Sequence, residues 1–162
     1  MNIKGFVIVF MAVFSLIALP VLLSAADSGR CMRCGMVVAE QPQWEGRSQR
    51  GDEQLSYCSP KCLLLTNPAD ADAKDLTITI KDYYSTKYID ASQAWYVAGS
   101  DVMGPMGPDL VPFEKKEDAE AFMKEHMGSG LYPYSALTLA KVKELLPMKK
   151  HHKKHKKAVS SD

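Results

Sequence analysis

The chain of 162 residues has room for one domain, or for two very small subdomains that share a core, but not for a large multidomain enzyme. Its formal net charge of +1 conceals a division, because residues 27–148 carry 13 Lys and Arg against 18 Asp and Glu, whereas residues 149–157 alone hold six Lys. An acidic body of this kind makes nucleic acid a poor partner, and none is expected.

The N-terminus has the pattern of an export signal. Lys4 supplies a positive start, residues 6–23 form an apolar run, and Ser24-Ala-Ala26 offers small residues for cleavage before Asp27. We therefore expect residues 1–26 to be a signal peptide and the mature chain to be periplasmic or otherwise extracytoplasmic. The apolar run also reaches the length of about 20 residues that a membrane-spanning helix needs, so an uncleaved N-terminal membrane anchor is the alternative.

A Lys- and His-rich tail follows Pro147. Residues 149–157 lack any apolar side chain that could order them, and we expect residues 148–162 to be disordered. The Lys charges would attract the tail to an acidic membrane surface or an acidic partner. The tail His residues would hold a metal ion only loosely, because the adjacent Lys charges repel cations.

Strand and helix patterns follow one another along the body. Leu76, Ile78 and Ile80 alternate with polar residues, as in a half-buried strand, and Ser59-Pro60 has the form of a helix N-cap followed by proline at the first helical position. In chain order we predict strands at 36–40, 47–50 and 54–57, a helix over 61–65, strands at 76–80, 94–98 and 110–113, a helix over 117–127, a short strand at 131–134 and a last helix over 136–146. The second half thus repeats the order of strands and helix in the first.

Soft metal ligands gather in two places. Cys31-Met-Arg-Cys34-Gly-Met36 lies just after the export signal, and Met103-Gly-Pro-Met106-Gly lies in the second half. Thiolates and thioethers suit Cu(I) better than they suit harder ions. The glycine and proline residues around Met103 and Met106 predict a loop with little packing reason for methionine, whereas the helical Met123 and Met127 are expected in the core.

The four cysteines allow three interpretations. Cys31 and Cys34 form a Cys-x2-Cys pair, and Cys58 and Cys62 form a Cys-x3-Cys pair. The set could be a structural four-thiolate zinc site, or it could form disulfides, which are common in exported chains. Alternatively, some or all of the thiols stay reduced and hold Cu(I). A disulfide in one pair is compatible with metal binding by the other.

His126 falls on the apolar face of the helix predicted over 117–127. We expect a histidine that is satisfied by a hydrogen bond within the core, and the alternative is a copper ligand that faces the Met loop.

Several ordered motifs resemble those of the NosL family, the accessory proteins of nitrous oxide reductase. They are Cys34-Gly-Met-Val-Val-Ala-Glu40, Asp82-Tyr-Tyr84, Trp95-Tyr-Val-Ala-Gly-Ser100, Met103-Gly-Pro-Met-Gly107, and Phe113 followed by Glu117-Asp-Ala-Glu-Ala-Phe122. The resemblance implies an α+β fold of two small related ββαβ-type units sharing a core, within a domain at 27–147 whose halves are about 31–73 and 74–147. It also implies Cu(I) binding, with Cys34, Met36, Met103 and Met106 as ligand candidates.

The chain departs from that family pattern in two respects. Family members are commonly lipoproteins anchored through a lipidated Cys, and no site of that kind is recognisable here. Cys58 and Cys62 are an addition that resembles the small metal-binding modules called TRASH. A copper pathway other than that of the reductase is therefore an alternative.

The Cys-x2-Cys pair also invites comparison with thiol oxidoreductases. Those enzymes place the first Cys at a helix N-terminus after a strand, where the helix dipole lowers the pKa of the thiol. Here the pair precedes Gly35 and β-branched residues, so we expect a carrier and not an enzyme. The expected function is delivery of Cu(I) to a copper-dependent apo-enzyme or a copper-transport partner. The alternative is a zinc-stabilised or disulfide-stabilised interaction module with no part in copper delivery.

Overall fold

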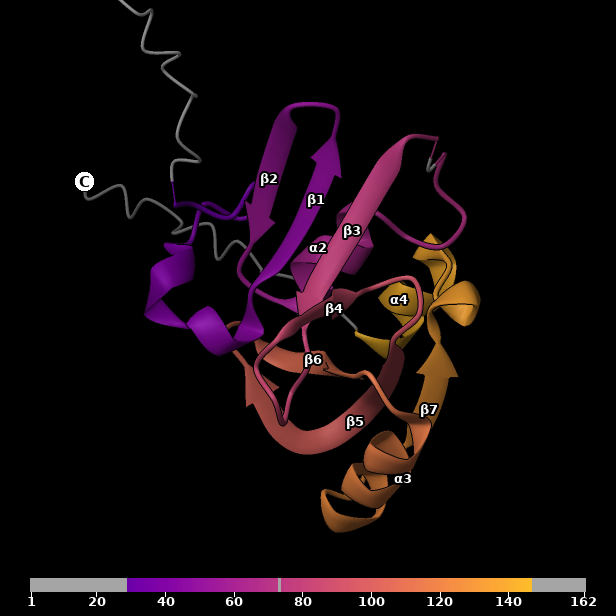
Figure 1. Ribbon diagram of the computed structural model, residues 1–162. Coiled ribbons are helices and arrows are strands. Elements are labelled where there is room, and N and C mark those ends of the chain that lie inside the picture. Colours follow the sequence, from indigo (N-terminus) through magenta and orange to yellow (C-terminus); the bar gives the residue numbers. More distant parts are fainter. Residues whose placement is uncertain (1–28, 73, 147–162) are drawn as a thin grey trace, which may run out of the picture.

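The computed structural model describes residues 29–72 and 74–146 (Figure 1), so the expected signal peptide and tail lie outside the described residues. The strands are β1 (Gly46–Arg50), β2 (Glu53–Tyr57), β3 (Leu76–Lys81), β4 (Tyr88–Asp90), β5 (Trp95–Gly104), β6 (Gly107–Phe113) and β7 (Gly130–Pro133). The α-helices are α2 (Pro60–Thr66), α3 (Lys116–Glu125) and α4 (Leu139–Leu145). Short 3-10 helices cover Val38–Glu40, Pro42–Trp44 and Tyr134–Ala136. Among these helices, none is long and apolar enough to cross a membrane.

The strands form two antiparallel sheets of related topology. The first has the order β2-β1-β3-β4, and the second has the order β6-β5-β7. In each sheet a hairpin is followed by a helix, and the next strand joins the outer side of the first hairpin strand. This arrangement confirms the predicted α+β fold of two related ββαβ-type units. The sheets divide between Asp90 and Trp95, later than the division expected near residue 73, because β3 pairs with β1.

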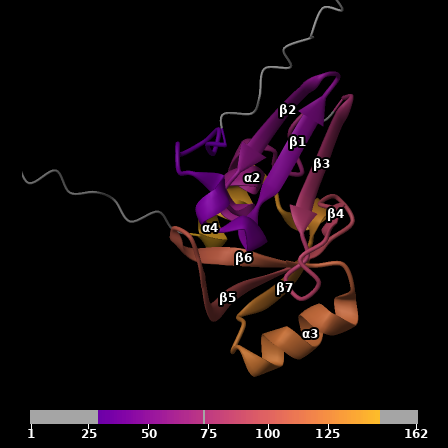
Figure 2. The ribbon, with the colours of Figure 1, turned by 60° about the vertical axis from the view of Figure 1, so that its left-hand side comes forward.

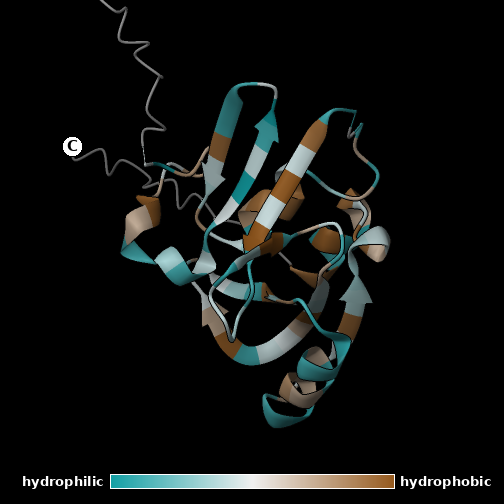
Figure 3. Cartoon of the chain, in the orientation of Figure 1, coloured by the Kyte–Doolittle hydropathy of each residue, from teal (hydrophilic) through white to brown (hydrophobic). Residues whose placement is uncertain are grey.

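A shared core joins the two units. Figure 2 shows α2 and α4 between the two sheets, where α2 contacts β1, β6 and α4. The main core combines Leu63 and Ile80 of the first unit with Tyr96 and Leu110 of the second. In Figure 3, α2 is largely brown, and brown residues alternate with paler ones along β3.

A smaller core lies under α3 on the opposite face of the second sheet. Val97, Val111 and Phe113 pack there against Ala119 and Phe122 of α3. Neighbouring residues of a strand point to opposite faces, so β5 contributes Tyr96 to the main core and Val97 to the smaller one. Ala119 and Phe122 are the fully buried residues of α3.

Three local predictions were wrong. The segment 36–40 is not a strand, because only Val37 pairs, in an isolated bridge with Arg30, before the chain turns into 3-10 helices around Pro42. The segment with Met103 and Met106 is not an irregular loop. Instead, β5 and β6 continue as a hairpin that Gly104 and Gly107 close as its last pair. Met127 is 73% exposed, since it lies beyond the end of α3 in a left-handed conformation with φ 53°.

Asp109 connects this hairpin to α2. Its Oδ1 atom accepts hydrogen bonds from the backbone N–H groups of Lys61 (2.7 Å) and Leu110 (2.9 Å). The other carboxylate oxygen has no hydrogen-bond partner in the described part of the chain. It faces Gly104, where an added Cβ would lie only 2.7 Å from it. Glycine is therefore required at position 104 for the hairpin to approach the carboxylate.

Burial raises the pKa of the Asp109 carboxyl from its ordinary 3.8 to about 6. Between these values the folded protein holds a proton that the unfolded chain has lost, so the free energy of unfolding should decrease as pH rises from 4 to 6. Asp109→Asn keeps an oxygen acceptor, but its side-chain amide does not ionise in this pH range. We expect the stability of the Asn variant relative to the parent to grow by about 3 kcal/mol over this interval.

Urea unfolding of both metal-free proteins at a series of pH values measures this difference. The comparison cancels the titration of groups that the two proteins share. Parallel stability profiles would mean that the Asp109 carboxylate is ionised over the whole interval.

Candidate metal centre

The Cys-x2-Cys segment forms a tight knuckle at the edge of the first sheet. The Gly35 N–H donates to the Cys31 carbonyl, and the Cys31 N–H donates to the Met36 carbonyl, both at 2.8 Å. Gly35 adopts φ 76°, in the left-handed region that glycine tolerates best. A hydrogen bond from Met32 N–H to the Ser56 carbonyl (2.9 Å) fixes the knuckle beside β2.

The Cys-x3-Cys segment lies at the junction of β2 and α2. Cys58 follows Tyr57, the last residue of β2, and Ser59 is the N-cap whose side chain accepts from the Cys62 N–H. This cap and Pro60 start the helix between the two cysteines, so that Cys62 lies in the first helical turn. The helix start predicted at Ser59-Pro60 is confirmed, and it places both thiols on the side where the knuckle lies.

The four cysteine sulfurs form one cluster. All four Sγ atoms lie within 4.8 Å of one another. Cys34 Sγ is 3.4 Å from Cys58 Sγ, and Cys58 Sγ is 3.7 Å from Cys62 Sγ. Four thiolates at about 2.3 Å from one tetrahedral ion would be separated by about 3.8 Å. The cluster therefore has the dimensions of a site for a single thiophilic ion.

Only one thiol of the cluster is exposed. Cys31, Cys58 and Cys62 are buried at 2%, 1% and 3% exposure, whereas Cys34 faces solvent. All four are free thiols. A metal ion here would be enclosed on three sides and accessible past Cys34.

The thiols influence one another electrostatically. Hydrogen bonding, first from the Cys62 thiol, lowers the pKa of Cys58 to about 6. Burial raises the pKa of Cys34 to about 11, and the hydrogen bond to Cys58 together with burial holds the pKa of Cys62 far above its ordinary value. At neutral pH the metal-free cluster therefore holds a thiolate at Cys58 while Cys34 and Cys62 remain protonated. A metal ion must displace their protons.

The predicted methionine ligands have different surroundings. Met36 is partly buried and packs against the core that contains Cys31, Cys58 and Cys62. Met103 and Met106 are 55% and 47% exposed at the tip of the β5–β6 hairpin. The predicted ligands thus divide into a cysteine cluster, a partly buried Met36 and an exposed hairpin that carries two thioethers.

Lys61 holds the Met hairpin next to the thiol-bearing helix. Its ammonium group donates to the Met106 carbonyl (3.2 Å), and its backbone N–H donates to Asp109. Because Lys61 directly precedes Cys62, these contacts bring the hairpin tip to the helix start. The roles of Lys61 and Asp109 could not be found in the sequence, since neither residue lies in a motif and their contact spans 48 positions.

His126 lies outside the sulfur cluster. Its Nδ1 atom is 2.9 Å from the Asp101 carboxylate, and its ring stacks on Phe122 at a centroid distance of 4.3 Å. His126 thus makes a hydrogen bond as expected, but to the exposed Asp101 at the edge of the smaller core and not inside it.

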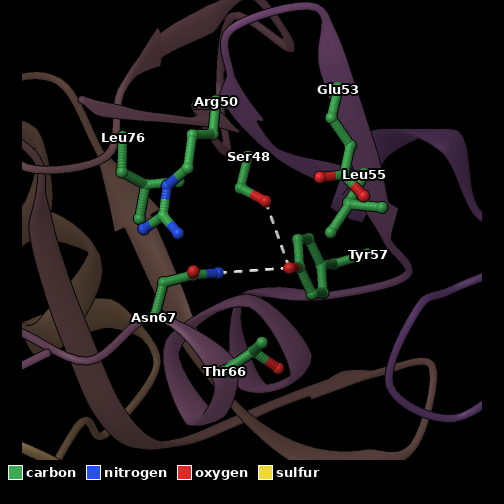
Figure 4. A pocket seen from close by; sticks show the side chains of 8 residues that line it. All are labelled: Ser48, Arg50, Glu53, Leu55, Tyr57, Thr66, Asn67 and Leu76. Carbon is green, nitrogen blue, oxygen red and sulfur yellow. Dashed lines mark hydrogen bonds between the residues drawn. The ribbon is translucent and has the colours of Figure 1, made fainter. Parts of the chain in front are cut away.

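A separate pocket lies beside β1 and β2 and has a volume of about 130 Å³. Figure 4 shows its polar side chains directed toward one another: Ser48 and Asn67 both hydrogen-bond the Tyr57 hydroxyl, at 3.1 and 3.2 Å. No sulfur lines it, so this pocket is not a site for a soft metal ion.

Comparisons with known proteins agree with this geometry. The family model NosL matches residues 21–142. The chain is 30% identical over 111 residues to "Copper-binding lipoprotein NosL" of Stutzerimonas stutzeri, an alignment that covers 63% of this chain and 58% of that protein. The chain thus spans little more than half the length of this curated relative.

A solved structure is also similar. The crystal structure of the copper chaperone NosL from Shewanella denitrificans matches with a TM-score of 0.59 and 27% identity, over 70% of this chain and 92% of that one. The family match covers most of the chain, including both sulfur segments and the Met hairpin. This chain belongs to the NosL family.

Proposed function

We propose that this chain binds one Cu(I) ion at the four-cysteine cluster and carries it to a partner protein. The observation that supports this proposal is the convergence of four free thiols within 4.8 Å, three of them buried and one exposed. Thiolates favour Cu(I) over harder ions. Two similar proteins are a copper-binding lipoprotein and a copper chaperone.

The proposed delivery step is ligand exchange. Cu(I) is satisfied by two or three soft ligands, fewer than the cluster offers, so one thiol is free to leave while the others hold the ion. Cys34 is the ligand that solvent and a partner can reach. An incoming sulfur would add to the ion there, after which the buried thiols release it. Met36 next to the cluster, and Met103 and Met106 on the hairpin, are the proposed thioether ligands that help to hold the bound ion while the thiols exchange.

The proposed role is that of an extracytoplasmic carrier and not of an enzyme. The proposed recipient is apo-nitrous oxide reductase, or a copper enzyme or transporter of a related pathway. The export pattern of residues 1–26 supports the location.

A second candidate function is a zinc-stabilised interaction module. It is favoured by the closed set of four thiols, because structural zinc sites are four-coordinate and supply folding energy to small domains. The exposed position of Cys34 and the adjacent Met hairpin favour the carrier.

The metal preference is the first test. The reduced chain, kept anaerobic, should bind one Cu(I) ion, and Cu(I) should displace Zn(II) from the cluster. Titration followed by mass measurement of bound metal and free thiols gives the stoichiometry. Stoichiometric Zn(II) that resists Cu(I), together with an unfolded metal-free chain, would establish the zinc module instead.

The Met hairpin is the second test. Met103→Leu with Met106→Leu should change the unfolding free energy of the metal-free chain by less than about 1 kcal/mol, because both side chains are exposed and the exchange conserves volume. Cu(I) affinity, measured by competition with a chelator, should fall about tenfold, equivalent to about 1.4 kcal/mol.

Met127→Leu is the matched control, since it removes an exposed thioether at the end of α3 and should leave the affinity unchanged. If the double variant binds Cu(I) as tightly as the parent, the hairpin thioethers are not ligands.

The pH dependence of Cu(I) affinity is the third test. At neutral pH the ion displaces protons from Cys34 and Cys62 but not from Cys58, whose pKa is lowered to about 6. Below that pH the ion must displace the Cys58 proton too. The plot of log affinity against pH should therefore steepen by about one proton below pH 6. Cys58→Ser should bind more weakly and lack this change of slope, and an unchanged slope in the parent would remove Cys58 from the site.

A further inference from the structure

The segments that carry the sulfur ligands are locally basic. Residues 30–36, 58–62 and 103–106 contain Arg30, Arg33 and Lys61 but no Asp or Glu, although the body at 27–148 has an excess of acidic residues. We call these three cations the basic rim. Because the domain as a whole is acidic, its overall composition does not explain why these segments carry only positive charges.

Backbone contacts hold the basic rim around the cluster. Arg30 donates to the Gly35 carbonyl at 2.9 Å, and Arg33 donates to the Leu65 carbonyl at 3.3 Å. Lys61 donates to the Met106 carbonyl at 3.2 Å. These contacts place each cation beside a sulfur-bearing segment without neutralising it. Across residues 29–72 and 74–146, the side-chain ion pairs involve other cations.

Exposed thioethers lie within the same region. Met32 is 61% exposed between the two knuckle cysteines, and Met103 and Met106 are exposed on the hairpin that Lys61 holds. Methionine adapts its shape to different partners. An adaptable apolar centre with charged residues around it is the composition of a transient protein interface. Cys34 is the metal ligand that such an interface would cover.

We propose that the basic rim docks an acidic face of the protein that receives the metal, bringing that protein's own sulfur or nitrogen ligands to Cys34. This inference rests on the proposed copper transfer and names the partner of that site by its charge. The occupant is a protein, because the rim surrounds the ligands that exchange the ion, and lipid head groups offer no soft ligands. Opposite charges would accelerate encounter more than they would tighten the complex.

The rim could also serve only to stabilise the negative charge of the metal–thiolate cluster. In that case neutral replacements would weaken Cu(I) binding itself, whatever the charge of the acceptor. A docking role affects the rate of transfer and depends on the acceptor. The two roles are therefore separable by experiment.

The experiment uses the full Cu(I)-loaded chain and two synthetic peptides that share a Cys-x-x-Cys acceptor and differ in flanking Asp or flanking Lys residues. Stopped-flow measurement at low salt should give transfer to the acidic peptide about tenfold faster or more. High salt should remove the difference, because it screens exposed charges. Arg30→Gln with Arg33→Gln should remove most of it at low salt, with Cu(I) affinity within about threefold of the parent, and Lys61 is kept because its side chain holds the Met hairpin.

A chain with the six tail Lys at 149–157 replaced by Gln is the matched control, and it should keep the preference. Equal rates with both peptides, or a preference that only the tail variant loses, would overturn the docking role. So would loss of Cu(I) affinity in the rim variant without a change in acceptor preference. Binding to phosphatidylglycerol vesicles that requires the rim and shields Cys34 from alkylation would assign the rim to a membrane. Failure to load Cu(I) at the outset would instead contradict the proposed function itself.

Discussion

The proximity of four thiols is the constraint on which the first half of the molecule depends. Sulfurs within 4.8 Å of one another cannot all ionise without a cation between them, because each new thiolate is repelled by the first. In the metal-free cluster, hydrogen bonds from neighbouring thiols favour a thiolate at Cys58. A bound cation would favour the thiolate form of each thiol that coordinates it. The left-handed Gly35, the Ser59 cap and the contact of Met32 with β2 all serve to hold the thiols in this arrangement.

The second ββαβ unit matters to the cluster mainly through one hairpin. The β5–β6 tip lies far along the chain from α2, and the contacts of Asp109 and Lys61 bring the two together. Burying a carboxylate with one oxygen lacking a partner costs stability. The arrangement therefore favours a precisely placed hairpin over a more stable one, which is consistent with a role for its thioethers.

Much of the fold could be predicted from local patterns in the sequence. The alternation at Leu76–Lys81 and the cap at Ser59 are local signals, and the structure agrees with both. The segment at 36–40 was mistaken for a strand because its β-branched residues suit a strand, whereas the partner that would extend the pairing beyond Val37 is missing among the described residues. Both sulfur pairs were visible in the sequence. Their convergence depends on the pairing of β1 and β2 and on the knuckle contact with Ser56, which no local pattern encodes.

The exposure of Cys34 has a consequence for the chemical lifetime of the empty protein. A solvent-facing thiol is normally the first of a group to be oxidised, but oxidation proceeds through the thiolate. Because the pKa of Cys34 is raised to about 11, almost none of it is ionised at neutral pH. The more acidic Cys58 is shielded from solvent by burial. The exposed thiol is therefore the less acidic one and the more acidic thiol is buried, a combination that slows oxidation of the metal-free cluster.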